Sequence, residues 1–161
     1  MAVEPPLLVM LVGLPGSGKS TAAGRLAATI RSQGRPCEIV GTDVYLEAEA
    51  ARRSLPYTAV FAEQFEIADA VMWKQAEAAI RSRISVIWDQ TNLTVSARRR
   101  RLRLFPGDYL RIAAVMPGTD DEAWQRNLAR GPDRAVPADA FNRMRAEFCR
   151  PGREEGFQMF L

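Results

Sequence analysis

Short continuous apolar runs alternate along the chain with longer segments in which apolar residues recur every three or four positions. Such runs lack polar alternation and are typical of strands that are buried on both faces of a sheet. A further strand is predicted at the end of the chain. The predicted strands are Leu7–Val12, about Cys37–Gly41, Ile84–Trp88, Leu110–Met116 and Phe157–Leu161.

The segments between these runs show helical spacing. Gly34 follows the first of them, Thr119 and Glu122 have the spacing of a capping box, and Pro137 suits the first turn of a helix. In the second segment the apolar stripe consists of Phe61, Phe65, Ala68, Met72, Ala76 and Ala79, and we expect Phe61 to lie in the core. The predicted helices are Lys19–Gln33, Phe61–Arg81, about Val95–Leu104, one that ends at Arg130, and one from Pro137.

The order of these elements predicts an α/β fold. Strand and helix alternate throughout the 161 residues, and neither a repeat nor a linker interrupts them. Such an order is typical of a three-layer α/β/α domain with a mostly parallel sheet, here of about five strands. In such sheets ligands bind beyond the carboxyl ends of the strands. We therefore expect one domain over residues 1–161, with its site at that edge.

The composition excludes several kinds of chemistry. The chain has no histidine, so a histidine general base, a Ser-His triad and a histidine-built metal site are excluded. A proton acceptor should then be a carboxylate. The two cysteines, Cys37 and Cys149, lie far apart and are expected to be free thiols. Neither a signal peptide nor a membrane span is expected, which favours a cytoplasmic protein without a membrane partner.

The clearest motif follows the first predicted strand. Gly13-Leu-Pro-Gly-Ser-Gly-Lys-Ser20 matches the phosphate-loop pattern and leads into an amphipathic helix. Its backbone N–H groups and the helix N-terminus would bind the phosphates of ATP, Lys19 would contact the β- and γ-phosphates, and Ser20 would bind Mg²⁺. The predicted nucleotide-binding residues in this segment are Gly13, Pro15, Gly16, Ser17, Gly18, Lys19, Ser20 and Thr21.

Two aspartates follow predicted strands and should face the same edge of the sheet. Asp89 ends a hydrophobic strand and is predicted to hold Mg²⁺ beside Ser20. Asp43 is the candidate general base for an acceptor hydroxyl. The alternatives are that Asp89 caps the next turn and that Asp43 caps the helix after it.

Several short motifs occur in one order with the phosphate loop. They are Thr42-Asp-x-Tyr45, Asp89-x-Thr-Asn-Leu93, Arg126-Asn-x-x-Arg130, Val136-Pro137 and Glu155-Gly-Phe157. Over nearly the whole chain this set resembles the P-loop kinases related to phage polynucleotide 5′-hydroxyl kinase. The resemblance implies that Asp43 engages a 5′-hydroxyl group and that Arg126 and Arg130 lie on a lid, about residues 124–140, that closes over ATP.

The spacing of the two lid arginines agrees with this implication. Arg126 and Arg130 are four residues apart and share one face of a helix, and guanidinium groups suit a transferring phosphoryl group. Two arginines on a helix can equally form a solvated face. The chain departs from the phage kinase at Leu46, where the family has an arginine that holds the acceptor phosphate.

The densest charge in the sequence lies between Arg98 and Arg103. Arg98 and Arg99 fall on the side of the predicted helix that carries Val95 and Leu102, so we expect them to reach the crevice. The cluster is either a grip for oligonucleotide phosphates or a solvated helix face. The candidate acceptor-binding residues are Tyr45, Asn92, Arg98 and Arg99.

The sequence therefore predicts a kinase that transfers the γ-phosphate of ATP with Mg²⁺ to a hydroxyl group. The leading hypothesis for the acceptor is a single-stranded 5′ end of DNA or RNA, which suits the net charge of +3. A small-molecule hydroxyl is the alternative that Leu46 favours, and a nucleotide-binding module without an acceptor is the third. The oligomeric state stays open.

Overall fold

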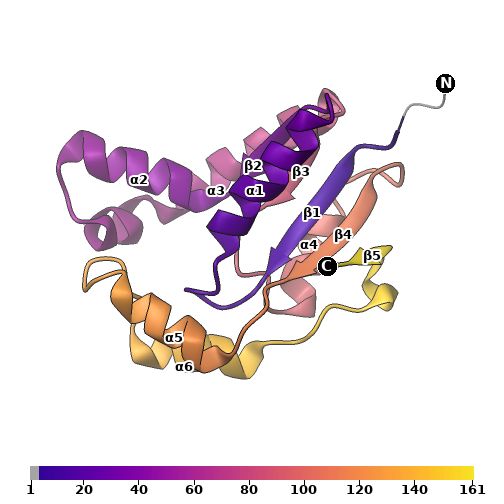
Figure 1. Ribbon diagram of the computed structural model, residues 1–161. Helices are drawn as coiled ribbons and strands as arrows, with labels where there is room; N and C mark the ends of the chain where they lie inside the picture. Colours follow the sequence, from indigo (N-terminus) through magenta and orange to yellow (C-terminus); the bar gives the residue numbers. More distant parts are fainter. Residues whose placement is uncertain (1–3) are drawn as a thin grey trace.

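The computed structural model describes residues 4–161, which contain one five-stranded parallel sheet (Figure 1). The spatial order is β2-β3-β1-β4-β5, and each neighbouring pair is parallel. The bounds of the first four predicted strands are confirmed to within one residue, and the last strand begins two residues later and ends one residue earlier than predicted. Their bounds are β1 Leu7–Val12, β2 Cys37–Val40, β3 Ser85–Trp88, β4 Leu110–Val115 and β5 Met159–Phe160.

Helices connect the strands as the periodicity predicts, with one addition. The sequence did not define the bounds of α2, which begins directly after β2, because three of its six apolar positions are alanines. The helices are α1 Lys19–Ser32, α2 Thr42–Arg53, α3 Tyr57–Arg81, α4 Val95–Leu102, α5 Asp120–Ala129 and α6 Ala138–Glu147, followed by the 3₁₀ turn η1 Arg153–Glu155. The capping box predicted for Thr119 and Glu122 is present at the start of α5.

The two faces of the sheet carry separate cores, which confirms the three-layer α/β/α architecture. In β1, Val9 and Leu11 pack with α1, whereas Leu8 and Met10 pack on the opposite face. That second core includes Met72 of α3 together with Trp88, Leu102 and Phe105. Because both faces are covered, β1 is a continuous apolar run rather than an alternating one. Among residues 4–161, no helix is both long and apolar enough to cross a membrane.

The first half of α3 departs from the prediction. The stripe residues Ala68 and Met72 are buried against the sheet and α2, but Phe61 and Phe65 are 42% and 38% exposed. The reason is length: α3 has 25 residues and extends about 37 Å, whereas β3 has four residues and extends about 13 Å. The sheet-facing stripe therefore continues past the carboxyl edge of the sheet, and the prediction of Phe61 as a core residue is wrong.

The helices α5 and α6 form a small unit that rests on the phosphate-loop segment. Leu14 of that segment packs with Leu93, Ala123 and Phe141, and Trp124 contacts Phe141 at a ring-centroid distance of 4.9 Å. Figure 1 shows both helices beside the end of β1, across from α2 and α3. This unit includes the segment predicted as a lid, and that role stays a prediction.

A buried ion pair contradicts the prediction that Arg98 reaches the crevice. The Arg98 guanidinium is fully buried and donates through Nε and Nη2 to the two carboxylate oxygens of Glu155, each at 2.8 Å. Its Nη1 donates to the carbonyl groups of Asn92, Leu93 and Cys149 at 2.8 to 3.0 Å. Helical spacing placed Arg98 correctly on the inward face with Leu102, but that face meets the C-terminal segment rather than the crevice.

We predict that Arg98→Ala lowers the free energy of unfolding by about 3 to 5 kcal/mol, because it leaves the Glu155 carboxylate buried and unpaired. Urea denaturation measures this change. The adjacent Arg99 is exposed, and Arg99→Ala should shift stability by no more than about 0.5 kcal/mol. Similar effects of the two substitutions would contradict the prediction.

A second prediction concerns Gly16, which has a φ of +81° and lies against α5. A Cβ atom there would approach the Ala123 carbonyl oxygen to 2.2 Å and the Asn127 nitrogen to 2.7 Å. Gly131 has a similar φ of +83° but open space around its Cα. Gly131→Ala should therefore cost about 1 kcal/mol for its backbone conformation alone.

In urea titrations, Gly16→Ala should lower the free energy of unfolding clearly more than Gly131→Ala does. It should also loosen α5, because the Cβ atom would meet the rigid backbone of that helix. Hydrogen exchange of the α5 amides measures the loosening. Equal destabilisation by both variants, with unchanged exchange in α5, would show that the close packing of Gly16 is unimportant.

Candidate functional site

The phosphate-loop segment joins β1 to α1 at the carboxyl edge of the sheet. Gly18 is the N-cap of α1 with a φ of +91°, and no atom lies within 4 Å of the position that its Cβ would take. The first turn of α1 has no acidic residue that would compete for the helix N-terminus. Gly18 thus leaves open space beside the positive end of a helix, the place where backbone N–H groups bind anions in such loops.

Lys19 is held within the same loop. Its Nζ donates to the Leu14 carbonyl oxygen at 2.7 Å and lies 3.5 Å from Ser17 Oγ. The pKa of Lys19 is lowered to about 8, chiefly by burial; the charge of Asp89 opposes this lowering, the charge of Arg130 adds to it, and the charge of Asp43 opposes it. One ammonium group therefore interacts with residues from β3's end, α2 and the end of α5, and these elements converge on the loop.

Asp89 follows β3 directly and lies beside Ser20. Its amide donates to the Val40 carbonyl oxygen at 2.8 Å. Burial raises the pKa of Asp89, while the nearby Ser20 hydroxyl and the Lys19 charge oppose that rise. The side chain thus faces the loop, in contrast to the alternative in which it only caps the next turn.

The pair of Ser20 and Asp89 fits Mg²⁺. A hydroxyl and a carboxylate are hard oxygen donors, and Mg²⁺ typically takes one or two protein ligands and completes its shell with phosphate and water. Residues 4–161 contain no cluster of three or more acidic, cysteine or histidine side chains that could bind a metal without such help.

Asp43 lies in the first turn of α2, but it does not cap that helix. Gly41 is the N-cap, and no side chain caps it. Instead, Tyr57 at the start of α3 donates its hydroxyl hydrogen to Asp43 Oδ1 at 2.7 Å. Burial and the Asp43 charge raise the pKa of Tyr57, so its hydroxyl stays a donor. Among residues 4–161, Oδ2 of Asp43 has no hydrogen-bond partner and is left for an incoming group.

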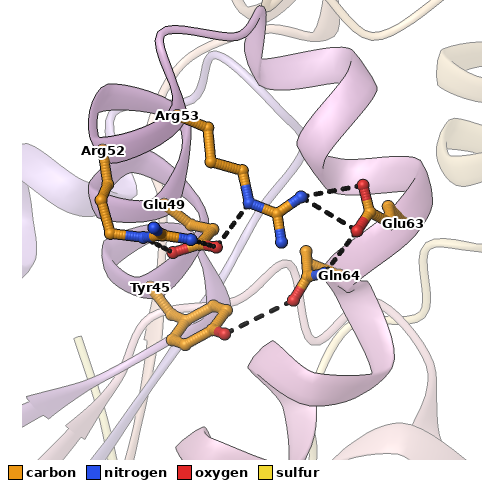
Figure 2. Close-up of polar contacts among 6 residues, drawn as sticks. All are labelled: Tyr45, Glu49, Arg52, Arg53, Glu63 and Gln64. Atoms are coloured by element: carbon orange, nitrogen blue, oxygen red, sulfur yellow. Dashed lines mark hydrogen bonds and ion pairs between the residues drawn. The ribbon is translucent and has the colours of Figure 1, made fainter.

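A polar clamp joins α2 to α3, the helices that carry Asp43 and Tyr57 (Figure 2). Glu49 accepts hydrogen bonds from Arg52 and Arg53, which lower the pKa of Glu49 to about 2. Arg53 also donates to both carboxylate oxygens of Glu63 on α3, each at 2.9 Å. The clamp is charged across the entire neutral pH range and joins the two helices side by side.

Arg126 and Arg130 are both exposed on the lid unit. Arg130 is the C-cap of α5, and its charge acts on both Lys19 and Tyr57. Arg126 makes no hydrogen bond or ion pair with the described part of the chain. The intervening Asn127 is fully buried and exchanges two hydrogen bonds, each 2.9 Å long, with the backbone of Val136. The roles of both arginines stay predictions, and Asn127 shapes the loop beside them.

The predicted acceptor residues do not form one group. Asn92 is buried with a φ of +49° and donates to the Leu11 carbonyl oxygen at 2.6 Å, so it ties the loop after β3 to β1 rather than lining a crevice. Arg98 is buried in its ion pair with Glu155. Tyr45 is half-buried between α2 and α3, where its hydroxyl lies 3.5 Å from Gln64 Oε1. Arg99 is exposed, and its role stays a prediction.

Three further residues at this edge make contacts that the sequence did not predict. Tyr57 touches the candidate base, and Asp133 accepts hydrogen bonds from the amides of Tyr57 and Thr58. Arg101 is half-buried and donates to Gln90 Oε1 at 2.6 Å. A tyrosine following Pro56 and a polar residue following Asp89 are the only sequence signals of these roles, and neither has a fixed spacing.

Comparison with known proteins gives one family. Residues 8–151 match AAA_33, described as an AAA domain. Among curated proteins, heterogeneous nuclear ribonucleoprotein U-like protein 2 of Mus musculus is 28% identical over 158 residues, 92% of this chain and 20% of that protein. The signal recognition particle protein of Mycobacterium bovis is 54% identical over 43 residues, 27% of this chain and 8% of that protein. This chain thus spans a fifth or less of these relatives.

Solved structures share the fold at low identity. Kti12 of Chaetomium thermophilum in complex with ADP-AlF3 has a TM-score of 0.64 at 17% identity, over 96% of this chain and 87% of that one. A chain of the Pnkp1/Rnl/Hen1 RNA repair complex has a TM-score of 0.64 at 22% identity, over 91% of this chain and 45% of that one. A gluconokinase from Sinorhizobium meliloti has a TM-score of 0.55 at 15% identity, over 99% of this chain and 82% of that one.

The family match covers most of the chain, and the structural likenesses agree with the phosphate loop, the parallel sheet and the two helical layers. A specific relation to phage polynucleotide kinase stays a prediction. The chain belongs to the AAA_33 family and has a P-loop nucleotide-binding fold.

Proposed function

We propose that this protein is an ATP- and Mg²⁺-dependent kinase whose acceptor is the 5′-hydroxyl end of DNA or RNA. The observation that carries the proposal is the convergence of four charged groups on one phosphate loop. The charges of Asp89, Arg130 and Asp43 all act on Lys19, and Asp43 stands on a helix that faces the loop across the sheet edge.

Each of these groups has a role in phosphoryl transfer. Lys19 and the loop amides would hold the β- and γ-phosphates, and Ser20 and Asp89 would hold Mg²⁺, which neutralises phosphate charge when it is bound. Oδ2 of Asp43 would accept the proton of the acceptor hydroxyl group while the oxygen of that hydroxyl group forms a bond to the γ-phosphorus. The bond from that phosphorus to the β,γ-bridging oxygen breaks, and ADP leaves.

The lid arginines would complete the charge balance. Arg130 is close enough to Lys19 to lower its pKa, and Arg126 lies one turn earlier on the same unit. Guanidinium groups in this position would stabilise the negative charge that spreads over the transferring group. A module that only binds nucleotide would need neither these arginines nor a free carboxylate oxygen at Asp43.

A small-molecule hydroxyl is the second candidate acceptor, and Leu46 is the observation that favours it. Leu46 is fully buried between α2 and α3, so its position offers no charge to an acceptor phosphate. The likeness to a gluconokinase is compatible with this candidate. Transfer that is insensitive to salt and to competing oligonucleotides would favour it over the 5′ end of a nucleic acid.

We predict that Asp43→Asn reduces phosphoryl transfer to a 5′-hydroxyl oligonucleotide by about 10² to 10⁴-fold, because the amide cannot accept the proton. Transfer of labelled phosphate measures the rate, and nucleotide titration should show nearly unchanged ATP binding. Asp139 lies in the first turn of α6, and Asp139→Asn is the matched control for loss of a helix-terminal charge.

Full activity of Asp43→Asn would exclude Asp43 as the base. An equal loss in Asp139→Asn would show that the effect is one of stability. No transfer to any 5′-hydroxyl end, at saturating ATP and protein, would reject the nucleic-acid acceptor.

We further predict that ATP affinity falls as the pH rises through about 8, because Lys19 then loses its charge. Bound phosphates favour the ammonium form, so the bound complex holds a proton that the free protein has lost above this pH. Affinity should therefore be constant near pH 7 and fall by up to about tenfold per pH unit above 8. Calorimetric titration between pH 7 and 9.5 measures it.

Lys19→Met should bind ATP weakly and with a flat profile over the same range. A wild-type affinity that does not change between pH 7 and 9.5 would contradict the assignment of the phosphate contact to Lys19.

A further inference from the structure

An aromatic row runs along α3 away from the candidate base. Tyr57, Phe61 and Phe65 are spaced by four residues, and their ring centroids lie 6.0 Å and 5.0 Å apart. The row begins at the Asp43 carboxylate, which Tyr57 contacts at 2.7 Å. It extends for about 12 Å along the helix.

These rings are not a leftover piece of the core. They continue the stripe by which α3 packs on the sheet, so they face the space beyond the carboxyl ends of the strands, where ligands of such sheets bind. In this part of α3 the buried residues are instead Val60 and Gln64, which lie on the side of the helix that meets α2. An exposed aromatic row at the edge of a polar site marks an interaction surface.

Positive charge lies at the Tyr57 end of the row and, farther along α3, beyond its Phe65 end. Arg134 lies over the Tyr57 ring at 4.9 Å, and Arg100 of α4 lies over the Trp73 ring at 4.9 Å, two turns beyond Phe65. Arg101 of the same helix is held by Gln90, directly after Asp89. Exposed rings with a guanidinium group at one end and another farther along the same helix suit a ligand that alternates planar groups with anions, which is the chemistry of a single-stranded nucleic acid.

We infer that Tyr57, Phe61 and Phe65 form a stacking platform for the first bases of a single-stranded acceptor whose 5′-hydroxyl group lies at Asp43. This inference rests on the proposed function and adds the element that distinguishes a nucleic-acid end from a small hydroxyl compound. The platform compensates for the missing charge at Leu46, because base stacking supplies affinity that does not depend on a phosphate contact at that position.

The experiment measures binding separately from catalysis. Fluorescence anisotropy measures binding of the full chain, in the presence of ADP and Mg²⁺, to two labelled oligonucleotides. One is a 5′-hydroxyl hexanucleotide, and the other is a hexamer of the same length whose first two positions are abasic. The variants are Phe61→Ala, Phe65→Ala and their combination. Ile67→Ala is the matched control, because Ile67 is 48% exposed on another face of the same helix.

We expect the wild type to prefer the hexamer with bases, and each phenylalanine variant to bind it about tenfold more weakly while binding the abasic hexamer unchanged. Ile67→Ala should behave as the wild type does. Thermal unfolding and ADP titration check that the exposed rings are not needed for folding or for the nucleotide. In phosphoryl transfer, the phenylalanine variants should show a KM for the oligonucleotide that is raised by the same factor, with kcat nearly unchanged.

Equal binding of the two hexamers by the wild type, or unchanged binding by the double variant, would overturn the platform. Transfer by the double variant at the wild-type KM would overturn it too, although the kinase function would stand. Ring-dependent binding without any transfer would support the platform and reject the proposed function. A dimer of the wild type that the double variant abolishes, without ring-dependent oligonucleotide binding, would assign the row to self-association instead.

Discussion

The buried pair of Arg98 and Glu155 is the interaction on which the geometry of the sheet edge depends. Both side chains are fully buried, and the guanidinium also holds the carbonyl groups of Asn92, Leu93 and Cys149. The first two carbonyls belong to the loop that follows Asp89, and the third belongs to the chain leaving the lid. A single cation therefore fixes the loop after β3 and the segment after α6 relative to each other.

A buried pair costs desolvation of both ions, and this one offsets it by satisfying many hydrogen bonds at once. Apolar residues of the same volume would leave three carbonyl groups without a donor in a dry interior, which is itself expensive. Asn92 extends the same network to the Leu11 carbonyl at the end of β1, two residues before the phosphate loop begins. Burial of an arginine here thus contributes less to net stability than to the placement of a loop.

Local sequence pattern predicted the features that neighbouring residues determine, but it could not predict how far adjacent elements extend. Period and caps were enough for β1, α1 and the capping box of α5, and a motif of fixed spacing was enough for the phosphate loop. The inward face of α4 was also predicted, but its partner, Glu155, is 57 residues away and no pattern links the two. Phe61 was misplaced because the stripe reports the face of a helix and not where the sheet beneath it ends.

The loop between α5 and α6 is joined to the start of α3 by hydrogen bonds that cap α3. Pro56 is the N-cap of α3 and has no side chain that can cap, so Asp133 from the lid loop accepts the amide hydrogen bonds of Tyr57 and Thr58. These bonds lower the pKa of Asp133, and the adjacent Arg134 pairs with Glu47 of α2. The helix end that positions Tyr57 against Asp43 is thus completed by the segment that carries Arg130.

Because an uncapped helix end loses stability, movement of the lid away from α3 would weaken the hydrogen bond that Tyr57 donates to Asp43, and closure would restore it. On the proposed function, Asp43 and Arg130 would therefore reach their places together, which would tie activation of the acceptor to closure over the nucleotide.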